Sequence, residues 1–72
     1  MNIYELSARF DARQSFYGKA HVIEHDDGTL ELLSYETIVA RCKDGKVERI
    51  PGVRSSQTTR RHIREFEKQF AR

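Results

Sequence analysis

The 72-residue chain has no tryptophan, a single proline, a single cysteine and no long run of apolar residues. The lone cysteine, Cys42, cannot form an internal disulfide, so the chain is not a disulfide-stapled scaffold and fits a reducing cytoplasm. No stretch approaches the roughly 18 apolar residues that cross a bilayer, so we expect no membrane partner. The opening MNIYELSARF lacks a basic segment followed by an apolar one, and we therefore expect no secretion signal.

The length suits one domain, residues 1–72, within which the charge is uneven. Residues 54–72 carry six basic and two acidic side chains, whereas residues 1–53 carry seven basic and nine acidic ones. The basic C-terminal part would therefore suit an acidic partner. A chain this short buries only about 60% of its unfolded surface, so a homo-oligomer would add core, although nothing in the sequence demands one.

The C-terminal stretch Ser55–Arg72 has the clearest periodicity of the chain. Its apolar positions follow a 4, 3, 4 spacing, which forms one stripe along a helix. These positions are Thr59, Ile63, Phe66 and Phe70. The serines and threonines at its start can cap a first turn, and a Pro-Gly turn precedes them. The sequence therefore predicts an amphipathic C-terminal helix.

The first predicted strand is Ser15–His25, where alternate residues share a face. Phe16, Ala20 and Val22 fall on one face, and Tyr17, Lys19, His21 and Ile23 fall on the other. Gly18 within it indicates a bulge or a close approach of the backbone. The preceding segment, Met1–Arg13, fits either one face of a helix or an edge strand, and we expect an ordered arm.

Two Asp-Gly pairs indicate hairpin turns, one at Asp26–Thr29 and one at Lys43–Lys46. Between them, Leu30–Lys43 is predicted as a long extended segment with a bend or bulge around Ser34–Glu36. Val47–Ile50 is the predicted return strand. Consecutive hairpins followed by a helix define an α+β fold: an antiparallel meander of three to five strands, with one face covered by the C-terminal amphipathic helix.

No residue set in the sequence has the spacing of a catalytic or metal centre. His21 and His25 would lie roughly 13 Å apart along a strand, too far to share one zinc ion. Cys42 and His62 lack a recognisable orienting group, so we expect a half-buried structural cysteine and a histidine packed at the helix edge. Phosphate loops, nucleophile elbows and close carboxylate pairs are also missing. We therefore expect a protein that is not an enzyme and uses no cofactor.

Basic residues provide the candidate contact surface for a partner. Arg60, Arg61, Arg64 and Lys68 gather on one arc of the predicted helix, and Tyr17 and Lys19 share one face of the predicted strand. Arginines on a helix can pair with phosphates, so direct DNA or RNA binding is one hypothesis. The other is a solvated or protein-contacting face, with Glu65 and Glu67 interleaved among the cations.

Three stretches of the chain carry a family resemblance: FDARQSFYGKA, LLSYETIVA and SSQTTRRHIREFEKQF. Together they resemble short uncharacterised proteins encoded by phages, plasmids and other mobile elements of Gram-positive bacteria. The matching pattern, SFYGKA, SYxTxVA and TTxRHIxEF, covers most of the chain after Phe10. That setting implies a binder of a host protein or protein–nucleic acid complex, such as an anti-CRISPR-like inhibitor of a defence nuclease.

Overall fold

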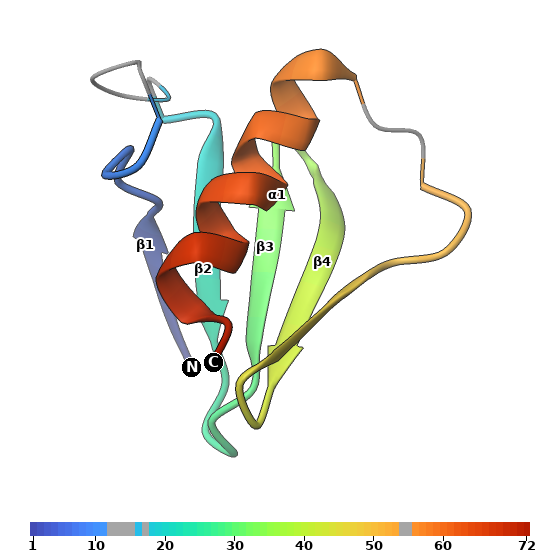
Figure 1. The fold of residues 1–72 in the computed structure, drawn as a ribbon. Helices are drawn as coiled ribbons and strands as arrows, with labels where there is room; N and C mark the ends of the chain where they lie inside the picture. Colours follow the sequence, from blue (N-terminus) through green and yellow to red (C-terminus); the bar gives the residue numbers. More distant parts are fainter. Residues whose placement is uncertain (12–15, 17, 54–55) are drawn as a thin grey trace.

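The computed structural model describes residues 1–11, 16, 18–53 and 56–72. Over these residues the chain forms a five-stranded antiparallel sheet in the order β1-β2-β3-β4-β5, and a single helix, α1, lies across one of its faces (Figure 1). The elements are β1 (Asn2–Glu5), β2 (Ala20–Glu24), β3 (Leu30–Ser34), β4 (Thr37–Lys43), β5 (Lys46–Arg49) and α1 (Gln57–Phe70). The predicted α+β meander covered by one C-terminal helix is confirmed.

The helix α1 starts and packs as its residue pattern predicts. Ser56 is the N-cap, and its side-chain oxygen accepts a hydrogen bond from the Thr59 backbone N–H at 3.1 Å. Of the predicted stripe, Thr59, Ile63 and Phe66 are buried and Phe70 is partly buried. Because so short a helix is marginal alone in water, this contact with the sheet is what stabilises it.

The hydrophobic core lies between α1 and the sheet. Its buried members are Leu6, Phe16, Ala20, Val22, Leu32, Val39, Ala40, Cys42, Ile63 and Phe66. Phe66 is fully buried, and its ring lies 5.2 Å from the ring of Phe70, centroid to centroid. Six of these ten residues come from the three central strands, and they meet two large side chains of the helix.

Both predicted Asp-Gly turns are present. At the second, Asp44 and Gly45 have φ values of 53° and 79°, the left-handed pair that a two-residue hairpin with the favoured twist requires. At the first, the His25 backbone N–H donates to the Thr29 carbonyl at 2.9 Å. These local signals set the β2–β3 and β4–β5 hairpins.

The predicted single extended segment Leu30–Lys43 is wrong, because the chain reverses at Tyr35 and Glu36 to form the β3–β4 hairpin. Tyr35 has a φ of 57°, which a bulky residue rarely adopts without tertiary support. Its ring lies 5.9 Å from the ring of His62, and the Lys19 ammonium lies 5.9 Å from the Tyr35 centroid. The turn residues alone therefore did not predict this reversal, because it is supported by contacts with residues distant in the sequence.

The predicted strand Ser15–His25 begins too early, because β2 starts at Ala20. Gly18 has a φ of +73°, and the Lys19 backbone N–H donates to the Phe16 carbonyl at 3.1 Å, which makes a turn there. Phe16 is nevertheless buried, as are Ala20 and Val22, with which it was predicted to share a face. The arm Met1–Arg13 contains an edge strand, β1, which resolves the alternative between helix and strand.

Replacing Phe66 by alanine should lower the free energy of unfolding by about 3–5 kcal/mol, because it leaves a cavity between α1 and the sheet. The matched control is Phe10→Ala, at a phenylalanine that is 56% exposed, where the change should stay within about 0.5 kcal/mol. Urea unfolding followed by circular dichroism measures both. Equal losses at the two positions would contradict the packing described here.

Candidate binding surface

The solvent-facing side of α1 carries a row of three exposed cations: Arg60, Arg64 and Lys68. They follow one another at four-residue spacing, which places successive side chains about 6 Å apart along the helix axis. Among the residues the structure describes, no carboxylate lies within ion-pair distance of any of the three. We call these residues the cationic row. It presents positive charge that no described carboxylate neutralises.

Of the other predicted contact residues, Arg61 and Lys19 do not join this row. Arg61 turns toward the segment after β1, where its Nε lies 3.9 Å from the Asp11 carboxylate. Lys19 is exposed but comes from the turn before β2, with its ammonium over the Tyr35 ring. Tyr17 lies outside the described residues. The structure thus groups three of the six predicted residues.

His62 lies on the side of α1 that faces the sheet and is fully buried, so the expectation of a helix-edge position is wrong. Its Nδ1 is 2.8 Å from the hydroxyl of the buried Ser34, and that hydroxyl is also 3.1 Å from the Thr59 hydroxyl. The Phe16 ring meets the imidazole edge-on, with the centroids 4.7 Å apart. No described residue forms a hydrogen bond with Nε2. Burial is the main reason that the pKa of His62 is lowered.

Glu65 is also buried, at 2% exposure, so it does not interleave with the cations as the second hypothesis assumed. Its carboxylate accepts a hydrogen bond from the Phe10 backbone N–H at 2.8 Å and another from the Gln69 amide at 2.6 Å. The same Gln69 amide donates to the Ser7 carbonyl at 2.6 Å. Glu65 and Gln69 therefore hold the segment after β1 against the helix.

A helical projection of the sequence contained a signal for both buried polar residues. Positions 59, 62, 63 and 66 follow the i, i+3, i+4, i+7 rule for one buried helix face, which places His62 inside the apolar stripe. Glu65 borders the same face. Burial of these two residues was not predicted, because polar and charged side chains are seldom fully buried without partners on other elements.

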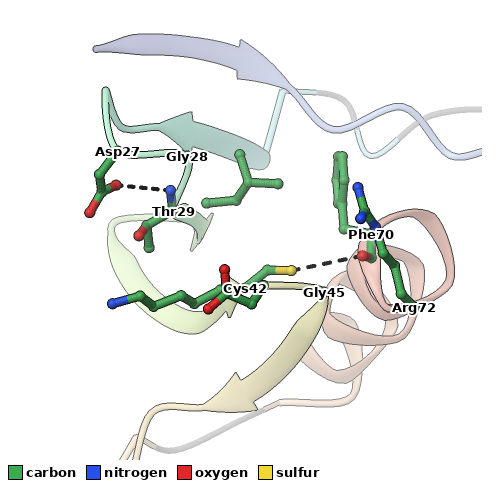
Figure 2. Close-up of a pocket in the computed structure, with 10 residues that line it drawn as sticks. Asp27, Gly28, Thr29, Cys42, Gly45, Phe70 and Arg72 are labelled. Atoms are coloured by element: carbon green, nitrogen blue, oxygen red, sulfur yellow. Dashed lines mark hydrogen bonds between the residues drawn. The ribbon is translucent and has the colours of Figure 1, made fainter.

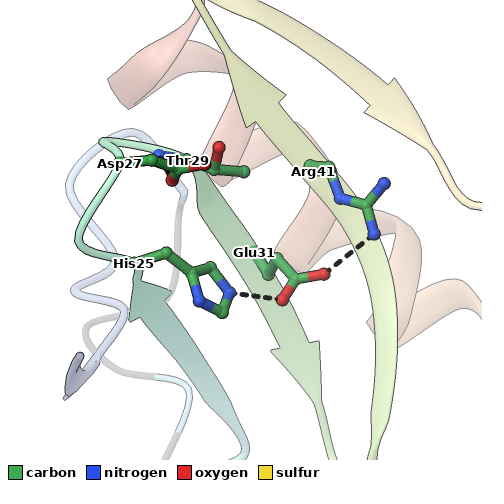
Figure 3. A network of polar contacts seen from close by, with 5 residues as sticks. All are labelled: His25, Asp27, Thr29, Glu31 and Arg41. Carbon is green, nitrogen blue, oxygen red and sulfur yellow. Dashed lines mark hydrogen bonds and ion pairs between the residues drawn. The ribbon is translucent and has the colours of Figure 1, made fainter.

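The sheet face that α1 leaves uncovered carries a polar network at one end (Figure 3). Glu31 accepts from His25 Nε2 at 2.6 Å and from the Arg41 guanidinium at 3.1 Å. The hydrogen bond from His25 is the main reason that the pKa of Glu31 is lowered. In the adjoining turn, the Thr29 backbone N–H donates to Asp27 at 2.9 Å and lowers the pKa of that carboxyl. Glu31 and Asp27 therefore have a structural role in this region, because each accepts hydrogen bonds from neighbouring residues.

A cavity of about 320 Å³ lies between the β2–β3 turn, the β4–β5 turn and the end of α1, and Figure 2 shows the residues that line it. The Cys42 thiol lies in its wall and donates to the Phe70 carbonyl at 3.8 Å. His62 is eight residues before Phe70 on the helix, or about 12 Å along its axis, so Cys42 and His62 lie in separate regions. Cys42 is buried at 5% exposure, more deeply than the half-buried position expected for it.

The described residues contain no group of three or more histidine, cysteine, aspartate or glutamate side chains placed to hold a metal ion. In the same part of the chain, no helix is long and apolar enough to cross a membrane. The most distinctive surface is therefore the cationic row, on a helix whose opposite face holds the fold together.

The fold and surface define a small α+β protein, a five-stranded meander under one helix across the described residues. The chain belongs to the family of unknown function DUF8033, whose model matches residues 4–72. This agrees with the expectation of a family without a settled function that spans most of the chain. Neither a curated protein nor a solved structure matches it.

Stability should fall as the pH drops through the range in which the unfolded His62 takes up a proton. Burial lowers the folded pKa of His62, with Lys19 acting in the same direction and Asp11 opposing it. An unfolded histidine titrates near about 6.5, so between the two pKa values the unfolded state binds more protons, and stability rises with pH.

The urea midpoint should therefore decrease from about pH 7.5 to about pH 5.5, and His62→Gln should flatten that slope. The lowered carboxyl pKa values of Glu31 and Asp27 affect stability only below about pH 5. Their contribution is therefore separate from that of His62, which falls at higher pH. A wild-type urea midpoint that does not change between about pH 5.5 and about pH 7.5 would contradict a buried, neutral His62.

Replacing Glu65 by alanine should destabilise the protein by about 1–3 kcal/mol, because the Phe10 N–H and the Gln69 amide lose their acceptor. Glu67→Ala is the matched control on the same helix. Its side chain is 43% exposed and lies 3.7 Å from Arg49, so its loss should stay below about 1 kcal/mol. Chemical denaturation compares the two, and equal effects would contradict the anchoring role.

Proposed function

We propose that this chain is a non-enzymatic binding protein that acts by occupying the surface of a partner macromolecule. The observation that carries the proposal is the cationic row, with its exposed Arg60, Arg64 and Lys68 left without ion-pair partners among the described residues. Such a row attracts an acidic surface and speeds encounter with it. A rigid helix holds the three charges in fixed order, which favours specific recognition over diffuse attraction.

The resemblance to mobile-element proteins supports a narrower form of this proposal. A phage or plasmid of Gram-positive bacteria would encode the protein, which would act in the host cytoplasm. Its partner would be a host protein or protein–nucleic acid complex, for example a defence nuclease that it inhibits in the manner of anti-CRISPR proteins. A nucleic-acid-binding enzyme has cationic surfaces of its own, so the partner's contact patch would be an acidic region beside them.

Direct binding of DNA or RNA by the same row is the alternative, because arginines on a helix also pair with phosphates. Three cations at helical spacing offer few phosphate contacts, and Glu67 lies beside them with a 43% exposed side chain. A protein partner is therefore the stronger proposal. The two make different predictions about salt, since phosphate binding weakens by a log–log slope of about 0.9 per phosphate neutralised.

The double variant Arg60→Gln/Arg64→Gln should reduce capture of the host partner on the order of tenfold, because it removes two charges from the contact. Lys43→Gln/Lys46→Gln is the matched control, since it removes the same charge from the β4–β5 turn, where both side chains are exposed. The tagged proteins are incubated with host lysate, and captured proteins are quantified by mass spectrometry.

A gel shift on random duplex and single strands at low salt tests the alternative on the same three proteins. Binding that the test variant loses and that declines with salt by the expected slope would favour nucleic acid. Equal capture of host protein by the wild type and the Arg60→Gln/Arg64→Gln variant would disprove the role of the row.

A further inference from the structure

The outer side of β1 has backbone groups that pair with nothing in the described part of the chain. β1 is an edge of the sheet and pairs with β2 alone. The Leu6 N–H donates to the Ala20 carbonyl at 2.9 Å, which sets the alternation along the strand. Hydrogen-bonded pairs alternate with non-bonded pairs in an antiparallel ladder, so the backbone groups of Ile3 and Glu5 point outward. No described residue occupies these donors and acceptors, so an added strand could pair with them.

The two edges of the sheet differ in their protection against such pairing. β5 carries charges at Lys46, Glu48 and Arg49, the usual device for blocking an edge. β1 has one charged residue, and it exposes 53% of Ile3 and 37% of Tyr4. The apolar and open edge is thus β1.

A hollow of about 340 Å³ adjoins β1 on the helix side of the sheet. Its lining includes Tyr4, Glu5, Arg9, Phe10 and Lys68. Tyr4 pairs with Val22, whose buried side chain lies under α1, so Tyr4 is on that same side. A strand added outside β1 would send alternate side chains toward this hollow.

Aromatic rings and two cations give the hollow its chemical preference. Tyr4 and the 56% exposed Phe10 offer apolar contact, and Arg9 and Lys68 add positive charge. Glu5 also lines the hollow, but its carboxylate accepts a hydrogen bond from the Gly18 N–H at 3.2 Å. Apolar and acidic side chains two positions apart would both reach it, because residues i and i+2 of a strand share a face. This pattern defines the partner segment: apolar, any residue, acidic, in either order.

We propose that the β1 edge receives an extended segment of a partner protein as a sixth strand. Its backbone pairs with Ile3 and Glu5, its apolar side chain enters the hollow, and its carboxylate lies beside Lys68 and Arg9. Strand addition of this kind takes affinity from the main chain and specificity from the pocket. The inference rests on the proposed function, whose protein partner it specifies through Lys68, a residue shared with the cationic row.

The charges on the helix side argue against a second copy of this chain as the occupant. In β1 itself, Tyr4 and Glu5 are adjacent, so they lie on opposite faces of the strand. A second β1 would therefore bring no carboxylate to Lys68. It would instead set the Arg9 and Lys68 of both copies along the same edge.

The test begins with selection of random eight-residue peptides displayed on phage against the immobilised full chain. Enriched sequences should contain an acidic residue two positions from an aromatic or aliphatic one. The selected peptide is then synthesised with a fluorophore, and its affinity is measured by polarisation. Ile3→Pro should weaken binding at least tenfold, because proline removes an outward N–H while sparing the bonds to β2.

Ile3→Ala is the matched control, since it keeps the N–H and should weaken binding less than Ile3→Pro. Lys68→Glu should shift the selection from acidic to basic residues at the position two away from the apolar one. Phe10→Ala should reduce peptide affinity without changing the unfolding midpoint. Should Ile3→Pro fail to fold, N-methylation of alternate peptide amides provides the same test, and one of the two alternate sets should abolish binding.

Selection without this pattern, or binding indifferent to both proline and N-methylation, would overturn the inference. A dimer in light scattering that Ile3→Pro dissociates would also overturn it, by making a second copy the occupant. If Ile3→Pro still captures the host partner while Arg60→Gln/Arg64→Gln does not, the inference fails and the proposed function stands. If Arg60→Gln/Arg64→Gln captures the host partner as well as the wild type while Ile3→Pro does not, the role of the cationic row is disproved and the β1 edge remains the contact.

Discussion

The burial of one face of α1 against the inner face of the sheet is the interaction on which the rest of the structure depends. Ile63 and Phe66 meet side chains from the central strands, and neither layer could bury its apolar residues without the other. In a chain this short the core has few large side chains, so each contributes a large share of stability. The contact fixes which side of the helix remains for other molecules.

Polar contacts under and beside the helix then orient it relative to the sheet. His62 bonds to Ser34 on β3, and Glu65 bonds to the backbone after β1, so the helix is tied to the middle of the sheet and to one edge. Hydrogen bonds of this kind contribute modestly when made and cost more when one partner is left unpaired. They therefore restrict the helix to one rotation about its axis, a rotation that apolar packing alone would leave less specified.

This arrangement leaves two surfaces that meet at Lys68. One is the cationic row along the outer side of α1, and the other is the open edge of β1 with its adjoining hollow. A partner that combines an acidic patch with an extended segment could contact both at once, which would raise affinity through the linkage of two weak contacts.

The sequence alone determined the features that depend on neighbouring residues. The periodicity of Ser55–Arg72 predicted the helix and its buried stripe, and the two Asp-Gly pairs predicted two hairpins, because backbone preferences at those positions are local. The cationic row was also visible, since its members lie on one helix. Tertiary structure decided the rest: the reversal at Tyr35, the burial of His62 and Glu65, and the outward edge of β1. Each depends on partners tens of residues away, whose positions only packing of the whole chain defines.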